Sequence, residues 1–416
     1  MSRIARVEAW PVNAPLEAPY LMAPGTVPGI SRTIVRLTTE DGIQGLGESA
    51  SVHDAKELRG ELGQGFVGRD TDEVRTELEP AVIAPPEHRT DGKVLIRNPG
   101  AGVEIALWDI AAREARVPLY EFLAQDRNPL ARIPVAQTSL KAPASRPHRS
   151  VIRSAPVEVP CRTQVQFTEY FAYRPGREDS PSEVAAYCAR MAEEHDSPVF
   201  EGKVAVRPVE EDARLVREIR AAIGPERELR LDANMGWRLE TARNALSLLE
   251  PFDVANVEEP LASFIEMAEL RRSSAIPFSA HTPDVTLAAE LGVPDALVLG
   301  LGRYGLAGTR RFIAECEQSG VGFWFYSGDF GIATAAYLQL AAATPYLDRP
   351  SQSLLRWTAD DVILGGPFSP ERGAVDVPTE PGLGVELDET ALDRCVERYA
   401  REGEYDFYSG GPLPRY

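Results

Sequence analysis

Strand-like patterns open the chain. Residues 3–12, RIARVEAWPV, are typical of a strand. Residues 33–48, TIVRLTTEDGIQGLGE, contain two further strand-like arms that meet at Asp41-Gly42. An Asp-Gly pair between two such arms is a strong signal for a tight hairpin turn, because glycine accepts the backbone angles that the turn needs. The pattern therefore predicts that the first region begins with antiparallel sheet.

A helical pattern follows these strands. In residues 101–123, AGVEIALWDIAAREARVPLYEFL, apolar side chains recur on one helix face, namely Val103, Leu107, Ile110 and Ala111. Pro118 is suited to begin the next short helix. Residues 1 to about 125 are thus predicted to form an α+β unit with its strands first.

From about residue 130 the pattern changes to alternating strands and helices. The candidate strands are 163–169, 199–204, 228–232, 254–257, 276–280, 296–299 and 321–326, and the clearest helices are 210–224, 239–252 and 308–320. This alternation indicates a parallel sheet, and its regularity favours a closed barrel over an open sheet. Residues 145–160 have little periodicity and are interpreted as an insertion or loop near the barrel's entry, whereas 389–402 are predicted to be helical.

The chain carries a large excess of negative charge. It has 44 Lys plus Arg against 63 Asp plus Glu, for a net charge of -19. Such a chain repels nucleic-acid phosphates and anionic lipid, so we expect neither as a partner. The N-terminal sequence MSRIARVEAWPVNAPL lacks a long apolar run, so we also expect no signal peptide. Four cysteines without CxxC spacing are interpreted as reduced residues of a cytoplasmic protein.

The candidate chemistry lies where the predicted strands end, because barrel enzymes carry their active sites at the carboxyl ends of the strands. Three consecutive strands end near Asp232, Glu258 and His281, with gaps of 26 and 23 residues between them. Carboxylate oxygens at neighbouring strand ends are suited to a hard divalent cation such as Mg²⁺. Lys203 ends the preceding strand and is expected to reach the same place.

These motifs together resemble the enolase superfamily, in its mandelate-racemase-like branch. The resemblance covers nearly the whole chain through TIVRLTTEDGIQGLGE, AGVEIALWDIAAREARVPLYEFL, LRLDANMGW, ANVEEP and the tail PGLGVELD. It implies an α/β fold, with an α+β capping domain at 1–128, a (β/α)7β modified TIM barrel at 129–380 and a C-terminal segment at 381–416 that returns to the capping domain. It also implies a homo-oligomer.

Within this branch the chain looks most like the glucarate dehydratase-like acid-sugar dehydratases, through TEYFAYRPGRE and FSAHTPD. The resemblance implies abstraction of the proton α to a substrate carboxylate, with Mg²⁺ stabilising the enediolate that forms. Lys203 is then the base, and Asp232, Glu258 and His281 are the metal ligands. Loss of a β-hydroxyl from the enediolate yields a 2-keto acid.

The second strand end departs from the family's Lys-x-Lys pattern. Here the motif is Glu201-Gly202-Lys203. Two neighbouring ammonium groups lower each other's pKa, whereas a carboxylate beside Lys203 raises it. Lys203 could therefore act as a base, as an acid or as a cation. The alternative without a catalytic role is an ion pair between Lys203 and Glu201 in the barrel wall.

The later strand ends depart as well. No histidine follows His281, so the His-Asp dyad of glucarate dehydratase-like enzymes is absent, and Tyr326 and Gly300 are assigned to the two places. Imidazole is a poor Mg²⁺ ligand and suits Mn²⁺ or another divalent metal better. His281 is therefore either a ligand or an acid-base group. If it is not a ligand, Asp284 is the alternative oxygen donor.

Further residues are assigned to substrate binding. They are Asn234 and Glu259 beside the two carboxylates, Arg303 after the sixth strand, and Tyr20 in the capping domain's loop. Some of the assigned residues also have an alternative without a functional role. Asn234 would then be a turn residue, Arg303 would lie in a surface loop, and Tyr326 would only fill the cavity.

Three functions remain open at this stage. The first is a divalent-metal-dependent dehydratase of a sugar acid, a lyase in which Lys203 acts on the α-proton and Tyr326 or His281 assists departure of the β-hydroxyl. The second is an epimerase or cycloisomerase that uses the same enediolate. The third is a barrel that binds a small carboxylate without turnover.

Overall fold

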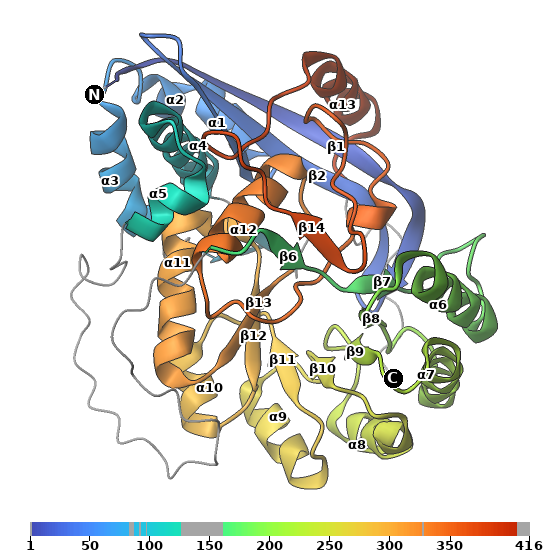
Figure 1. Ribbon diagram of the computed structural model, residues 1–416. Coiled ribbons are helices and arrows are strands. Elements are labelled where there is room, and N and C mark those ends of the chain that lie inside the picture. The colour runs from blue at the N-terminus through green and yellow to red at the C-terminus, as the bar shows by residue number, and fades with distance from the viewer. Residues whose placement is uncertain are drawn as a thin grey trace.

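The computed structural model of the protein describes residues 2–82, 87–90, 93–96, 98–125, 161–326 and 328–405. These ranges contain an N-terminal α+β cap and a curled parallel sheet surrounded by helices (Figure 1). The predicted fold class is thereby confirmed. The predicted insertion at 145–160 and the predicted domain boundary at 128 lie outside the described residues. Within the described ranges no helix is long and apolar enough to cross a membrane.

The cap is built on a three-stranded antiparallel sheet in the order β1-β2-β3. Its strands are β1 (Ile4–Met22), β2 (Gly25–Thr39) and β3 (Gln44–Ser49). The predicted turn at Asp41-Gly42 is confirmed, and Gly42 has the positive φ of 87° that makes glycine suitable there. The first strand runs well past the predicted residue 12, because it continues to pair with β2 through a register shift between Pro15 and Tyr20.

Helices follow this sheet in the chain, and several of them pack on one side of it. They are α1 (Asp54–Arg59), α2 (Glu61–Gln64), α3 (Thr71–Val82), α4 (Pro99–Ala115) and α5 (Leu119–Gln125), and the short hairpin β4 (Glu87–Thr90) and β5 (Lys93–Ile96) lies before α4. The helical pattern over 101–123 with a second short helix beginning at Pro118 is confirmed, as the pair α4 and α5. Arg116 separates them in a left-handed conformation, with φ of 58°.

Seven parallel strands form the barrel sheet, in the order β13-β12-β11-β10-β9-β8-β7. They are β7 (Glu169–Phe171), β8 (Val199–Lys203), β9 (Glu228–Asp232), β10 (Asn256–Glu258), β11 (Phe278–Ala280), β12 (Ala296–Leu299) and β13 (Gly322–Phe325). The prediction of one strand over 163–169 is wrong. Its first half is β6 (Gln164–Gln166), which pairs with β14 (Ala374–Asp376) outside the barrel sheet.

A segment without regular strand structure lies between the two edges of this sheet. Gln352 N donates to Phe325 O at the end of β13 over 2.8 Å. On the other side, Ser351 N donates to Gln166 O over 2.9 Å and Thr168 N donates to Ser351 O over 2.8 Å. Residues 351–352 therefore take the place of an eighth strand, and they bring Gln352 into the barrel.

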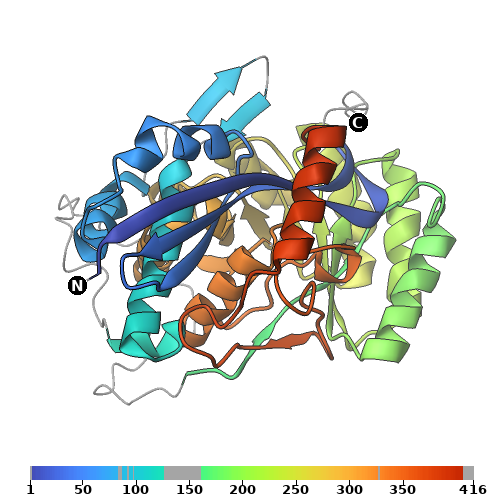
Figure 2. The ribbon, with the colours of Figure 1, turned by 90° about the horizontal axis from the view of Figure 1, so that it is seen from above.

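Helices alternate with the barrel strands as predicted. They are α6 (Pro181–His195), α7 (Val209–Ile223), α8 (Leu239–Leu249), α9 (Phe264–Leu270), α10 (Val285–Leu291), α11 (Leu301–Ser319) and α12 (Gly331–Ala343), with short 3-10 turns η1 (Glu250–Phe252), η2 (Arg271–Ser273) and η3 (Leu355–Trp357). The predicted C-terminal helix is α13 (Glu389–Glu402), and it packs against β1 of the cap (Figure 2).

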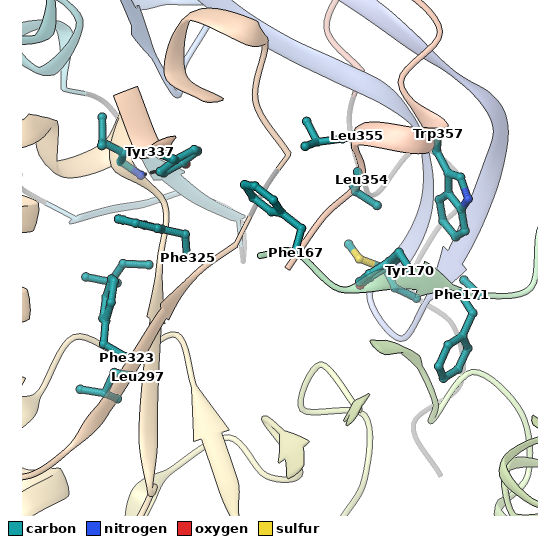
Figure 3. Packing of buried hydrophobic residues seen from close by; sticks show 14 of the residues in the cluster. Phe167, Tyr170, Phe171, Leu297, Phe323, Phe325, Tyr337, Leu354, Leu355 and Trp357 are labelled. Atoms are coloured by element: carbon teal, nitrogen blue, oxygen red, sulfur yellow. Dashed lines mark hydrogen bonds between the residues drawn. The ribbon is translucent and has the colours of Figure 1, made fainter. Parts of the chain in front are cut away.

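Alternation along the barrel strands separates apolar from polar side chains. Phe323 and Phe325 of β13 point toward the surrounding helices, and the Phe325 ring lies 4.6 Å from that of Tyr337 in α12 (Figure 3). The opposite faces of the strands carry polar groups, all buried inside the barrel, among them Glu201, Arg230, Asn256, Glu258 and Ser279. The barrel interior therefore joins this polar layer, on β8 to β11, to an apolar cluster of Ala296, Val298 and Trp324 on β12 and β13.

Candidate active site

Lys203 and Asp232 form a buried ion pair at the ends of β8 and β9. The two residues are register partners in the sheet, and Lys203 Nζ lies 2.5 Å from Asp232 Oδ2. Burial lowers the pKa of Lys203, but the charge and hydrogen bond of Asp232, together with Tyr170 and Tyr20, outweigh burial and raise this pKa well above its ordinary value. Lys203 is therefore protonated in this arrangement.

The chain turns sharply after β9, so that Asn234 folds back onto Asp232. Asn234 has a positive φ of 45°, which asparagine tolerates better than most residues. Its backbone N donates to Asp232 Oδ1 over 2.8 Å, and its Nδ2 donates to Asp232 Oδ2 over 3.1 Å. Asn234 thus orients the Asp232 carboxylate.

A second pair of opposite charges joins Glu258 at the end of β10 to His281 after β11. His281 Nε2 lies 2.7 Å from Glu258 Oε1, and His281 Nδ1 lies 3.1 Å from the carbonyl oxygen of Val298. Burial lowers the pKa of His281, but Glu258 and the nearby Glu259 outweigh it and raise this pKa to about 10. Both ring nitrogens face oxygen acceptors, so both carry protons.

Gln352 connects two buried carboxylates inside the barrel. Its Nε2 donates to Glu201 Oε1 over 2.8 Å and to Glu258 Oε2 over 2.6 Å. Ser279 Oγ also faces Glu258 Oε2, at 3.4 Å. The sequence interpretation missed Gln352, although its position after α12, where an eighth strand is due, is a signal that could have found it.

Glu201 does not form the ion pair with Lys203 that was considered as its structural role. It bonds to Gln352, and its Oε2 lies 4.0 Å from Arg230 Nη1. Burial, the strongest influence, raises the pKa of Glu201 to about 8 with the help of Glu258, while Arg230 acts against the increase. Strand alternation places Glu201 and Lys203 on the same face of β8. The Lys203 side chain nevertheless reaches Asp232, its register partner on β9, instead of Glu201.

Three tyrosines surround the two ion pairs. Tyr20 comes from the β1–β2 hairpin of the cap, Tyr170 from β7, and Tyr326 follows β13. The Tyr20 ring lies 6.0 Å from the Tyr170 ring, and Lys203 Nζ lies 5.8 Å from the Tyr170 ring. Burial raises the pKa of Tyr20, which also senses the charges of Lys203 and Asp232. The cap therefore contributes a neutral hydroxyl beside the barrel's charged groups.

Tyr326 and Gly300 lie against each other, as their assignment to the missing dyad requires. A Cβ atom on Gly300 would come within 2.5 Å of the Tyr326 ring, so glycine at 300 makes room for the tyrosine. The Tyr326 ring also stands nearly perpendicular to the His281 ring, with 5.3 Å between the centroids. Burial raises the pKa of Tyr326, so its phenol keeps its proton.

A buried charge cluster that the sequence interpretation missed anchors the loop after Tyr326. Arg32 of β2 donates from Nε to Asp329 Oδ1 over 2.7 Å. Glu48 of β3 accepts from the backbone N of Phe330 and of Ala333, each over 2.9 Å. The cap therefore holds the chain between β13 and α12 with an arginine and a carboxylate. Arg32 belongs to none of the motifs named above, whereas Glu48 is the last residue of TIVRLTTEDGIQGLGE, which gave no sign of this role.

The remaining predicted residues lie at the edge of this arrangement. Glu259 accepts from His281 N over 3.3 Å. Arg303 lies in the first turn of α11, with its guanidinium 5.2 Å from the Tyr304 ring. Asp284 is exposed and accepts from Leu287 N over 2.9 Å at the start of α10. Its carboxylate thus serves as a helix cap, which disfavours the alternative in which it replaces His281 as an oxygen donor.

The fold and this arrangement agree with the comparison to known protein families. Residues 4–124 match the mandelate racemase / muconate lactonizing enzyme N-terminal domain, and residues 183–391 match the enolase C-terminal domain-like family. The chain belongs to the enolase superfamily.

Its relatives within the superfamily carry out different reactions. A D-Ala-D/L-Ala epimerase of Cytophaga hutchinsonii is 25% identical over 92% of this chain and 95% of its own. A protein named as a probable glucarate dehydratase of Streptomyces coelicolor is 30% identical over 51% of this chain and 50% of its own. The crystal structure of an enolase from Mycobacterium smegmatis, complexed with tartrate, has 25% identity and a TM-score of 0.79 over 97% of this chain and 94% of its own.

Members of this superfamily bind Mg²⁺, so the candidate ligands were tested for fit. Asp232 and Glu258 are oxygen donors on adjacent strands, as a hard cation requires. Asp232 is bonded to Lys203 and Asn234, however, and both ring nitrogens of His281 lie against oxygen atoms of the chain. Within the described ranges, no three His, Cys, Asp or Glu side chains form a group that could hold a metal ion. The three residues as arranged do not fit a three-ligand metal site.

Proposed function

We propose that the protein is an enzyme that removes the proton α to the carboxylate of a small acid, and that its reaction is dehydration of a sugar acid. The observation that carries the proposal is the convergence of Lys203, Asp232, Glu258 and His281 at the ends of four adjacent strands. A small carboxylate among these groups meets two protein cations and several hydroxyl donors. The tartrate bound to the Mycobacterium smegmatis enolase, a hydroxylated diacid, supports this substrate class.

The protonation states of the side chains in the site suit an acid-assisted elimination. In the proposal, the Lys203 ammonium passes one proton to Asp232 when the substrate binds, and the neutral amine then takes the α-proton from one side. His281 or Tyr326, both protonated, donates a proton to the departing β-hydroxyl from the other side. Water leaves, and the resulting enol tautomerises to a 2-keto acid. Asn234, Arg303 and Tyr20 are proposed to contact the substrate's oxygens.

An epimerase or cycloisomerase is the second candidate. The epimerase of Cytophaga hutchinsonii matches nearly the whole length of this chain, whereas the dehydratase relative matches only half. Epimerisation needs a second group that returns a proton to the opposite face of the α-carbon. Among the groups described, His281 is the one that we propose for this role.

The proposal is tested by a screen of mono- and di-acid sugars for 2-keto acid, run with Mg²⁺, with Mn²⁺ and with a chelator. Each compound is also incubated in deuterated water to detect exchange of its α-proton. A hit with exchange but no keto acid indicates the epimerase. No keto acid and no exchange with any compound, together with ligand-induced thermal shifts, indicates a protein that only binds carboxylates.

Two variants then test Lys203 on the substrate found. Lys203→Ala removes the amine, and Lys203→Arg keeps a charge beside Asp232 but cannot lose its proton at neutral pH. We expect both to reduce α-proton exchange by about 100-fold or more. Lys56→Ala, on an exposed face of α1, is the matched control and should leave exchange unchanged. Exchange that survives in Lys203→Arg would show that Lys203 acts only as a cation.

A further inference from the structure

The two carboxylates that a divalent cation would bridge already have cationic partners from the chain itself. Asp232 faces the Lys203 ammonium at 2.5 Å, and Glu258 faces the His281 imidazole at 2.7 Å. Asp232 is 1% exposed and Glu258 is fully buried. Buried carboxylates need compensating charge, and each of these two obtains it from one side chain.

His281 could bind a metal through Nε2 only if the ring and the Glu258 carboxylate moved apart, because Nε2 lies 2.7 Å from Glu258 Oε1. A metal binds a ring nitrogen through its lone pair, and the second nitrogen then carries the proton. Here Nδ1 lies 3.1 Å from Val298 O, a group that only accepts, and Nε2 lies against the Glu258 carboxylate. The perpendicular Tyr326 ring, 5.3 Å away, lies against the imidazole.

We propose that His281 and Lys203 replace the divalent metal of this site, so that the chain takes up neither Mg²⁺ nor Mn²⁺ between Asp232 and Glu258. This inference rests on the proposed function, because it names the groups that balance the substrate's negative charge in the same site. The imidazolium of His281 and the ammonium of Lys203 then face the developing enediolate oxygens. An oxygen donor at position 281 would remove one of the two cations and complete an all-oxygen ligand set.

The test measures metal binding alone, by titration calorimetry with Mg²⁺ and by the electron paramagnetic resonance signal of free Mn²⁺. We expect no saturable binding to the wild-type chain up to about 1 mM metal. His281→Asp and His281→Asn, which supply oxygen, should each bind one equivalent at least about 10-fold more tightly. His195→Asp is the matched control, because His195 ends α6 at the opposite end of the barrel, and it should behave as the wild type.

Two results would overturn the inference. One is binding of a single metal ion by the wild-type chain below about 1 mM that is lost in Asp232→Asn. The other is a wild-type chain and folded His281 variants that all fail to bind, because His281 would then not be what replaces the metal. The wild-type titration stands even if a variant does not fold. Activity in the chelator arm of the substrate screen is a separate readout, so failure of the proposed function is distinguishable from failure of this inference.

Discussion

At the scale of single residues, the barrel interior concentrates carboxylates that share few cations. Glu201, Asp232 and Glu258 are all buried, and Gln352 supplies one amide to two of them. Arg230 lies 4.0 Å from Glu201, too far for a hydrogen bond. The negative charge of an ionised Glu201 would therefore have little compensation from nearby cations. Protonation of Glu201 should consequently change the free energy of unfolding.

We predict that Glu201→Gln changes how stability depends on pH. The pKa of Glu201 is about 8 in the folded chain against an ordinary value of 4.5, so the folded state holds a proton that the unfolded state releases. Its contribution is complete below about pH 4.5 and is lost as the pH rises through about 8. The wild-type free energy of unfolding in urea should fall between pH 5.5 and pH 8.5, and the decrease should be smaller by about 3 kcal/mol in the variant.

The control for this prediction is Glu290→Gln, an exposed change on α10, which should keep the wild-type pH profile. Equal slopes for Glu201→Gln and the wild type would contradict the raised pKa.

At the scale of elements, close contact between α4 and β3 sets how the cap helix lies on its sheet. A Cβ atom on Gly47 would come within 1.8 Å of the carbonyl oxygen of Gly102 in α4. Gly45, two residues earlier on the same face, would meet Ala106 O at 2.2 Å. The glycines of IQGLGE are thus required by a helix that approaches the strand backbone directly.

Gly47→Ala should destabilise the protein, because α4 must move away from β3 to admit a methyl group. Overpacking of this kind costs about 1–3 kcal/mol in the free energy of unfolding. Gly65→Ala is the matched control, since its nearest neighbour would be 3.3 Å away and its φ of −64° suits alanine. Chemical denaturation measures both, and equal stability of the two variants would contradict the close packing.

At the scale of the whole molecule, buried polar contacts join the cap to the barrel. Glu104 of α4 accepts from the backbone N of Leu306 and Ala307 in α11, over 2.7 and 3.0 Å. Arg32 reaches from β2 to Asp329 beyond β13. The α13 helix packs back on β1, and Arg398 donates to Asn13 O over 2.9 Å. These contacts predict that cap and barrel unfold together.

Arg32→Met should weaken this connection strongly. It leaves Asp329 buried without its cation, a loss of about 3–5 kcal/mol, and the calorimetric midpoint should fall. Arg32→Met with Asp329→Leu should recover part of that loss, because Asp329 is no longer buried without its cation. Arg6→Met, whose side chain is 56% exposed, is the control. A decrease no larger than that of the control would show that the buried pair does not join the domains.

The sequence alone determined the features that repeat or depend on neighbouring residues. The Asp41-Gly42 hairpin follows from glycine's backbone freedom, and the helix at 389–402 from its apolar spacing. The order of barrel strands follows from regular alternation with helices. The superfamily assignment rests on the order of the sequence motifs along the chain. It implied roles for the residues at the strand ends.

Only the tertiary structure decided which charges meet. Arg32 and Asp329 are 297 positions apart, and Gln352 lies 94 positions from Glu258. No local pattern marks which of these residues meet, because such contacts depend on where whole elements pack and on the length of each side chain. The same reason explains why Lys203 pairs with Asp232 rather than with Glu201 on its own strand. Strand alternation determines the face on which a side chain lies, and packing determines the partner that it meets there.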